Sequence, residues 1–290
     1  MAGDAAANTA PFAIGPPQPG TDGGTLFVIA HPDDEALFFL PSLVAAQRGT
    51  APAPLRAPVH VLCLSTGDYY GLGRARSHEL AAAVTRAGLD ARRDLTLLDH
   101  PALRDGPGDA WPQALVARAV AATCATTRAA TIVTFDARGV SGHVNHSATH
   151  YGVALLARAL RARGPSTALP SEAEARFDGA SDFADAPVPP ACLERCLALE
   201  TVPVARAYLG MLDLVISGVL MISAWLAQQR WRRSAHAKPE RTGHARTRAT
   251  SANLPLALHV MAAHWTQLVW YRVLMVIFSR YTYVNTLVAM

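Results

Sequence analysis

The stretch TLFVIAHPDDE, residues 25–35, decides the fold. Its first part, TLFVIA, is a short apolar run of the kind that forms a strand covered by helices on both faces. The run leads directly into His31, a proline and three carboxylates. In open α/β sheets ligands bind just beyond the carboxyl ends of the strands, so this ending is a candidate functional site.

Strands and helices are expected to alternate after this first strand. The sequence predicts strands over 59–65, 94–99 and 131–136, and helices over 35–47, 74–87 and 112–124. Gly88 follows the second helix, where a C-terminal glycine commonly ends a helix. The alternation predicts an α/β fold with a Rossmann-like, doubly wound and mostly parallel sheet flanked by helices.

The chain divides by composition into three parts. Residues 1–24 are rich in Ala, Gly and Pro, and we expect a disordered N-terminus without a cleavable signal peptide. Residues 25–205 are expected to form the catalytic domain, with an insertion of low order at about 164–190. Residues 206–290 are expected to complete the domain with hydrophobic helices and to contact a membrane.

The membrane expectation rests on two neighbouring segments. Residues 208–227 are almost wholly apolar, so they suit either a bilayer or a buried helix of the domain. Residues 230–248 carry seven Lys or Arg against one Glu, which favours an anionic membrane surface. No aromatic-interleaved basic motif accompanies them, so we expect no nucleic-acid partner.

Two histidine motifs indicate a metal site. His31 and a carboxylate three residues later can offer a nitrogen and an oxygen on one side of the turn, and the HVNH segment at 143–146 can supply a third ligand. Two histidines, one carboxylate and an open position indicate a catalytic rather than a structural zinc site. Such a site also accepts other divalent ions. The four cysteines lack CxxC spacing, which argues against a zinc ribbon.

Three segments together resemble a known family. AHPDDE at 30–35, GLGRARSHEL at 71–80 and TFDARGVSGHVNH at 134–146 are similar, in order, to the hallmark segments of the GlcNAc-PI de-N-acetylases. These are the PIG-L proteins, within the wider LmbE-like deacetylases. HWTQLVWYR at 264–272 and FSRYTYVNTL at 278–287 resemble the eukaryotic, membrane-linked branch.

The resemblance implies roles for five residues. By motif position, His31, Asp34 and His146 would be the metal ligands. Asp33 would be the general base that takes a proton from the attacking water. His143 would stabilise the oxyanion or protonate the leaving amine.

The resemblance also implies a substrate-facing loop. Arg76 and Glu79 fall near the sugar pocket of the family, and Asp68 stands in the loop before them. Asp68 replaces an expected Asn, and Tyr69 and Tyr70 are unusual at their positions. By its place in the family, this loop implies that Arg76 and Asp68 contact the substrate.

The implied activity is zinc-dependent removal of the acetyl group from N-acetylglucosaminyl-phosphatidylinositol, an early step of GPI-anchor biosynthesis. It implies a glycolipid substrate and a place on the cytosolic face of the endoplasmic reticulum membrane. GLGRAR lacks the third glycine of a dinucleotide fingerprint and follows the second strand, so no nucleotide cofactor is expected. Two other functions stay open: deacetylation of a soluble N-acetylglucosamine conjugate, and glycolipid binding without turnover.

Structural roles compete with the proposed chemistry at several positions. Asp33 and Asp34 are also suited to cap the following helix. His143 and His146, taken singly, are suited to a polar surface loop. His264 lies in the C-terminal matching segment, and its role stays open.

Overall fold

The apolar run that starts at Thr25 forms β1, a central strand of a seven-stranded sheet in a computed structural model of the chain. The structure describes residues 23–108, 111–163, 195–210, 246–250 and 253–290, with single positions and pairs between 212 and 226. The strand order is β3-β2-β1-β4-β5-β7-β6. The strands are β1 (Thr25–Ile29), β2 (Val59–Cys63), β3 (Leu95–Leu97), β4 (Thr131–Phe135), β5 (Arg195–Leu199), β6 (Arg246–Thr250) and β7 (Val284–Ala289).

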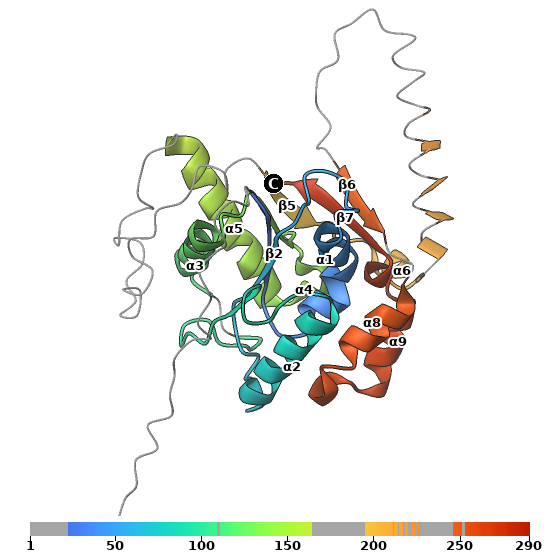
Figure 1. The fold of residues 1–290 in the computed structure, drawn as a ribbon, viewed down its shortest axis with the longest axis horizontal. Helices are drawn as coiled ribbons and strands as arrows, with labels where there is room; N and C mark the ends of the chain where they lie inside the picture. Colours follow the sequence, from blue (N-terminus) through green and yellow to red (C-terminus); the bar gives the residue numbers. More distant parts are fainter. Residues whose placement is uncertain are drawn as a thin grey trace, which may run out of the picture.

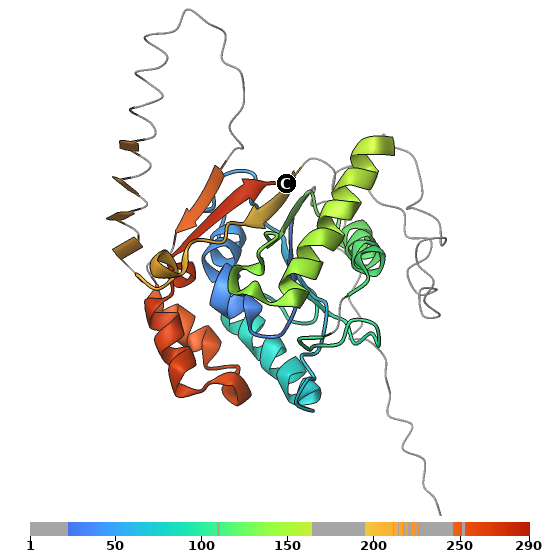
Figure 2. The same ribbon diagram turned by 180° about the vertical axis from the view of Figure 1, so that it is seen from behind.

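Helices cover both faces of this sheet (Figure 1). On one face α3 and α5 pack against each other, and on the other α1 and α2 lie beside α8 (Figures 1 and 2). The main helices are α1 (Leu40–Gln47), α2 (Gly73–Arg86), α3 (Gln113–Thr127), α5 (Val144–Arg163), α8 (Leu254–Met261) and α9 (Trp270–Phe278). Shorter elements are η1 (Glu35–Phe39), α4 (Gly139–Gly142), α6 (Val204–Ala207), η5 (Trp265–Gln267) and η6 (Arg280–Thr282).

The predicted fold class is confirmed, because β1 to β5 are parallel and connected through helices. β7 runs antiparallel to β5, and β6 runs antiparallel to β7. Parallel strands buried on both faces are almost continuously apolar, which is why β1, β2 and β4 were readable from sequence. All five residues of β1 are buried.

The antiparallel extension was not predicted. β6 has the sequence RTRAT and lies at the edge of the sheet, so it has no apolar pattern to reveal it. It occupies the end of the basic segment 230–248, whose earlier part lies outside the described residues. The predicted helix over 35–47 is also divided, since it starts with π-helical η1 and continues as α1.

The segment 208–227 is described only in part. Its described positions from Leu212 to Leu226 are helical, and apolar side chains there are exposed, among them Leu212 at 66% and Val219 at 60%. This exposure does not agree with a helix buried in the domain. Among the described residues, no helix combines the length and the apolar character needed to cross a bilayer. Residues 1–22 and the predicted insertion at 164–190 lie outside the described residues.

Candidate active site

The carboxylate of Asp34 holds the turn that follows β1. Asp34 Oδ2 accepts hydrogen bonds from the backbone N–H groups of Ala30, at 3.0 Å, and His31, at 2.9 Å. The turn after β1 is thereby closed on itself, and Asp34 and His31 are both buried. A carboxylate that accepts backbone N–H groups is held in one orientation, so the other oxygen of Asp34 has a defined direction.

The loop after β4 positions His146. The rings of Phe135 and His146 are stacked, with centroids 4.1 Å apart and an interplanar angle of 2°. His146 Nδ1 lies 2.8 Å from the carbonyl oxygen of Gly139. A carbonyl only accepts hydrogen bonds, so Nδ1 carries the hydrogen and Nε2 is left with its lone pair. Gly139 has φ +66, a conformation that favours glycine.

The two loops converge at the carboxyl end of the sheet. Ring nitrogens of His31, His143 and His146 lie within 4.8 Å of one another. His146 Nε2 is 3.1 Å from Asp34 Oδ1, and His31 Nδ1 is 3.9 Å from Asp34 Oδ2. The structure therefore brings together the three residues expected to bind metal, and places His143 beside them.

The donor atoms fit a divalent cation. His146 Nε2 and Asp34 Oδ1 both present lone pairs to each other at 3.1 Å, an arrangement that needs a proton or a cation between them. The hydrogen bond from His146 Nδ1 to a backbone carbonyl is the usual support of a metal-binding histidine. Imidazole nitrogens with a carboxylate oxygen suit zinc and other first-row divalent metals.

Electrostatics at the site follow from burial and close charges. Burial alone would raise the pKa of Asp34, but the charge and hydrogen bond of His146 and the charge of His31 hold it well below the usual range. Burial alone would lower the pKa of His146, but the charge and hydrogen bond of Asp34 raise it. Burial and the charges of His31 and His146 lower the pKa of His143. A lower pKa favours the neutral form of His143.

Asp33 is held by two arginines. Its backbone has φ 117, unusual for a residue other than glycine, and its N–H donates to Glu35 Oε2 at 3.1 Å. Its Oδ2 accepts from Arg272 and, at 3.4 Å, from Arg76 Nη2. Both of these contacts go to the same oxygen, so Asp33 Oδ1 is the oxygen that remains for a water. Asp33 therefore lies next to the histidine cluster without contributing to the close contacts within it.

The two expected substrate contacts have protein partners. Arg76 is buried and donates to the carbonyl oxygens of Pro32, at 2.7 Å, and Gly67, at 2.8 Å. Asp68 is exposed and accepts from the N–H of Gly73, the first residue of α2, at 2.6 Å. Arg76 thus contacts the turn that follows β1, and Asp68 contacts the start of α2, the helix that carries Arg76.

Two residues of the site were missed from sequence. Asp105 Oδ1 lies 3.1 Å from His31 Nε2, and its Oδ2 lies 3.3 Å from Arg76 Nη1. Asn145 Nδ2 also lies 3.1 Å from His31 Nε2, while its Oδ1 is buried without a hydrogen-bond partner among the described residues. The signal for Asp105 was its place in the loop after β3, at the same sheet edge as the two motifs.

The C-terminal part of the chain reaches the site at three further points. His264 Nε2 contacts Glu35 Oε1 at 2.5 Å, and Thr266 donates to both oxygens of Glu79 through its N–H, at 2.9 Å, and its hydroxyl, at 2.8 Å. Arg272 of α9 donates to Asp33. The segment that follows α8 therefore positions the carboxylates of Glu35, Glu79 and Asp33.

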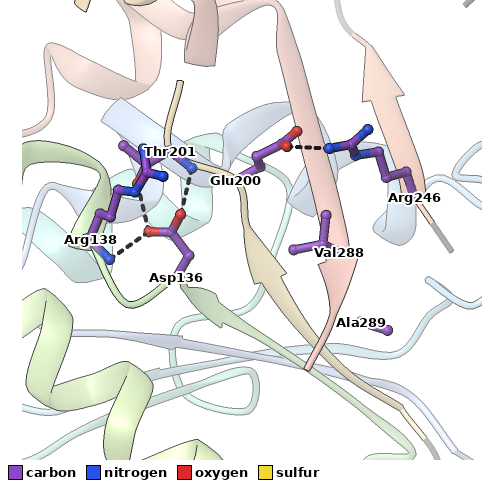
Figure 3. A pocket seen from close by; sticks show the side chains of 7 residues that line it. All are labelled: Asp136, Arg138, Glu200, Thr201, Arg246, Val288 and Ala289. Carbon is purple, nitrogen blue, oxygen red and sulfur yellow. Dashed lines mark hydrogen bonds and ion pairs between the residues drawn. The ribbon is translucent and has the colours of Figure 1, made fainter. Parts of the chain in front are cut away.

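A separate cavity of about 530 Å³ is lined by Asp136 and Arg138, which follow β4, and by residues of β6, of β7 and of the segment after β5 (Figure 3). None of the three clustered histidines lines it. Asp136 accepts there from the N–H of Thr201 at 2.8 Å and from its hydroxyl at 2.5 Å, which anchors the loop to the end of β5. Glu200 and Arg246 form an ion pair across the mouth, with 2.8 Å between Oε1 and Nη2. Thr201 also accepts from the N–H of Val140 at 3.0 Å, so it holds the loop that leads to His146.

The chain combines a Rossmann-like sheet with a histidine and carboxylate cluster at the carboxyl edge of that sheet. A solved structure of an antimicrobial-reagent pseudoaglycone deacetylase shares the fold, with a TM-score of 0.50 and 14% identity over 93% of this chain and 97% of that one. The model of the PIG-L family, GlcNAc-PI de-N-acetylase, matches residues 26–157.

Curated relatives extend the match beyond the family model. The N-acetylglucosaminyl-phosphatidylinositol de-N-acetylase of Bos taurus is 30% identical over 275 residues, covering 94% of this chain and 87% of the bovine protein. A probable enzyme of the same name from Dictyostelium discoideum is 26% identical and covers 91% of this chain and 92% of its own length. The chain belongs to the PIG-L family of GlcNAc-PI de-N-acetylases.

Proposed function

We propose that this protein removes the acetyl group from N-acetylglucosaminyl-phosphatidylinositol with the help of a divalent metal, in GPI-anchor biosynthesis at the cytosolic face of the endoplasmic reticulum membrane. The observation that carries the proposal is the cluster of His31, His143 and His146 within 4.8 Å, with Asp34 Oδ1 3.1 Å from His146, in a chain of this family. The names of the relatives support the substrate.

The metal would be held by His31, Asp34 and His146, with zinc as the first candidate. When bound, such a cation would act as a Lewis acid on the acetamide carbonyl and make an attacking water more acidic. Asp33 would accept the proton of that water through Oδ1, because Arg272 and Arg76 occupy Oδ2. The same proton would pass to the departing nitrogen, so that acetate and a free amine are released.

His143 would stabilise the oxyanion. Its Nδ1 accepts from the backbone N–H of Asn145 at 3.2 Å, so in the neutral ring Nε2 carries the hydrogen. The lowered pKa of His143 keeps the ring in this neutral form, which donates a hydrogen bond to a developing negative charge. Arg76 would hold Asp33 and Asp105 in place, next to the sugar that it is expected to contact.

Mass spectrometry of acetate release from N-acetylglucosaminyl-phosphatidylinositol tests this proposal, with the metal content of the protein measured in parallel. We expect release that a chelator abolishes and that added zinc restores. Asp33→Asn should abolish turnover while metal stays bound. Wild-type rates in that variant would show that Asp33 is not the base.

A soluble N-acetylglucosamine conjugate in the same assay tests the other enzymatic function. Faster turnover of the soluble conjugate than of the glycolipid would favour a soluble amino sugar as the substrate. Binding of the glycolipid by metal-loaded protein without any acetate release would instead favour a binding protein.

A further inference from the structure

The turn η5 and helix α9 expose a group of large apolar side chains. We call the following residues the aromatic face: Trp265, Val269, Trp270, Tyr271, Leu274 and Phe278. Trp270 is 75% exposed and Trp265 is 71% exposed, and Val276 is the one fully buried side chain of α9. Contiguous exposed apolar groups of this kind mark interaction surfaces.

The aromatic face carries no free charge of its own. Residues 251–290 contain no Asp, Glu or Lys and only two arginines. Arg272 is paired with Asp33, and Arg280 Nε lies 2.5 Å from Asp213 Oδ2. A surface of Trp, Tyr and aliphatic side chains without negative charge is compatible with both neutral and anionic lipid headgroups, and Trp and Tyr are enriched where membranes meet water.

A second exposed apolar segment starts at the end of this helix. The backbone of Gly210 packs against α9, since a Cβ atom at Gly210 would lie 3.2 Å from the carbonyl oxygen of Ile277. Asp213 pairs with Arg280, just after α9. On either side of Asp213, the side chains of Leu212, Val215, Val219 and Ile222 are 59–66% exposed. α6, which precedes this segment, lies near one end of α9 (Figure 1). The apolar exposure therefore continues from α9 onto its neighbour.

The aromatic face also borders the catalytic cluster. Tyr271 directly precedes Arg272, whose side chain reaches Asp33, and Trp265 directly precedes Thr266, which holds Glu79. Exposed residues thus alternate along this segment with residues that contact the active-site carboxylates. A surface that lay on a membrane through these side chains would bring the catalytic site to the level of the headgroups.

We propose that the aromatic face docks on a phospholipid surface and presents the active site to sugar headgroups of lipids within it. This inference rests on the proposed function for its substrate, but its docking step does not depend on turnover. Docking through uncharged side chains should occur on vesicles of phosphatidylcholine alone, as well as on vesicles that also contain phosphatidylinositol.

Vesicle sedimentation with the full chain tests the docking step. We expect Trp265→Ser with Trp270→Ser to lower the partition coefficient at least about fivefold on both kinds of vesicle. Leu274→Ser with Phe278→Ser should have the same effect through different residues of the face. Tyr151→Ser, which removes an exposed aromatic side chain of α5 in the opposite helix layer, is the control and should bind as the wild type does. Circular dichroism and thermal melting establish that each variant is folded.

Partition within twofold of the wild type for both folded pairs would overturn the proposal. The proposal would also be overturned if the wild type did not bind vesicles but self-associated, as seen by light scattering, and if both pairs lost that self-association. The aromatic face would then bind a second copy of the chain.

A substrate analogue without acyl chains separates docking from catalysis. N-acetylglucosaminyl-inositol phosphate should be deacetylated at equal rates by the wild type and both pairs, whereas turnover of the glycolipid in vesicles should fall with binding. If the wild type deacetylates neither compound, the proposed function fails while the vesicle result still decides the docking. If both pairs lose the soluble reaction as well, the face belongs to the catalytic structure and the docking proposal is overturned.

Discussion

His264 Nε2 lies 2.5 Å from Glu35 Oε1, and both side chains are fully buried. The other oxygen of Glu35 accepts from the backbone N–H of Asp33 at 3.1 Å. Burial alone would lower the pKa of His264, but the charge of Glu35 and the hydrogen bond to it raise that pKa. His264 therefore holds Glu35, and Glu35 in turn holds the backbone of Asp33, the proposed general base.

His264→Ala should destabilise the protein, because it leaves the buried carboxylate of Glu35 without its partner. Breaking a buried pair from one side costs about 3 kcal/mol or more in the free energy of unfolding. Urea denaturation measures the change. The matched control is His259→Ala, five residues earlier and exposed, which should change stability by less than about 0.5 kcal/mol. Equal stabilities of the two variants would contradict the role of the pair.

Arg272→Ala should lower kcat roughly 100-fold, since a misplaced reacting group commonly has an effect of that size. The variant leaves Asp33 with Arg76 as its remaining arginine contact. Bound metal, measured by atomic emission, should stay at the wild-type level, because Arg272 contacts none of the proposed ligands. Arg272→Lys keeps the charge and should recover part of the rate. Loss of metal in Arg272→Ala would show instead that α9 supports the cluster itself.

Gly139→Ala should lower metal affinity. A Cβ atom there would lie 2.7 Å from Cβ of His146, and the residue has φ +66. The clash would displace His146 from Phe135 and Asp34. Gly142→Ala in the same loop shares a positive φ, +78, but meets nothing within 4 Å, so it reproduces the backbone strain without the clash. Competition with a chelator should show weaker binding in Gly139→Ala alone, and equal affinities would argue against the clash.

Stability should fall in mild acid through His60. Burial, opposed by the charge of Asp94, lowers the pKa of His60 from 6.5 to about 4. The unfolded chain then binds the proton more readily, so the stabilisation is complete above pH 6.5 and is lost as the pH falls from 6.5 to about 4. The full loss is about 3 kcal/mol. His60→Gln should flatten this part of the curve of unfolding free energy against pH, and a curve parallel to the wild type would contradict the assignment.

Local patterns made much of the sheet predictable. A strand covered on both faces is a short apolar run, and β1, β2 and β4 each show one. The rule that ligands bind beyond the carboxyl ends of such strands then directs attention to His31 and His146. By contrast, β6 is polar because it lies at an edge, and nothing in its sequence distinguishes it from the basic segment around it.

By itself, the sequence determined the alternation of strands β1 to β4 with helices, the family resemblance and the residues that follow β1 and β4, because periodicity and strand-end position depend on neighbours along the chain. Only the tertiary structure decided what holds the active-site carboxylates. Glu35 and His264 are 229 residues apart, Glu79 and Thr266 are 187 apart, and Asp33 and Arg272 are 239 apart. Such contacts have no local signature, since they arise when α8 packs against α2 and η1, and η5 packs against α2.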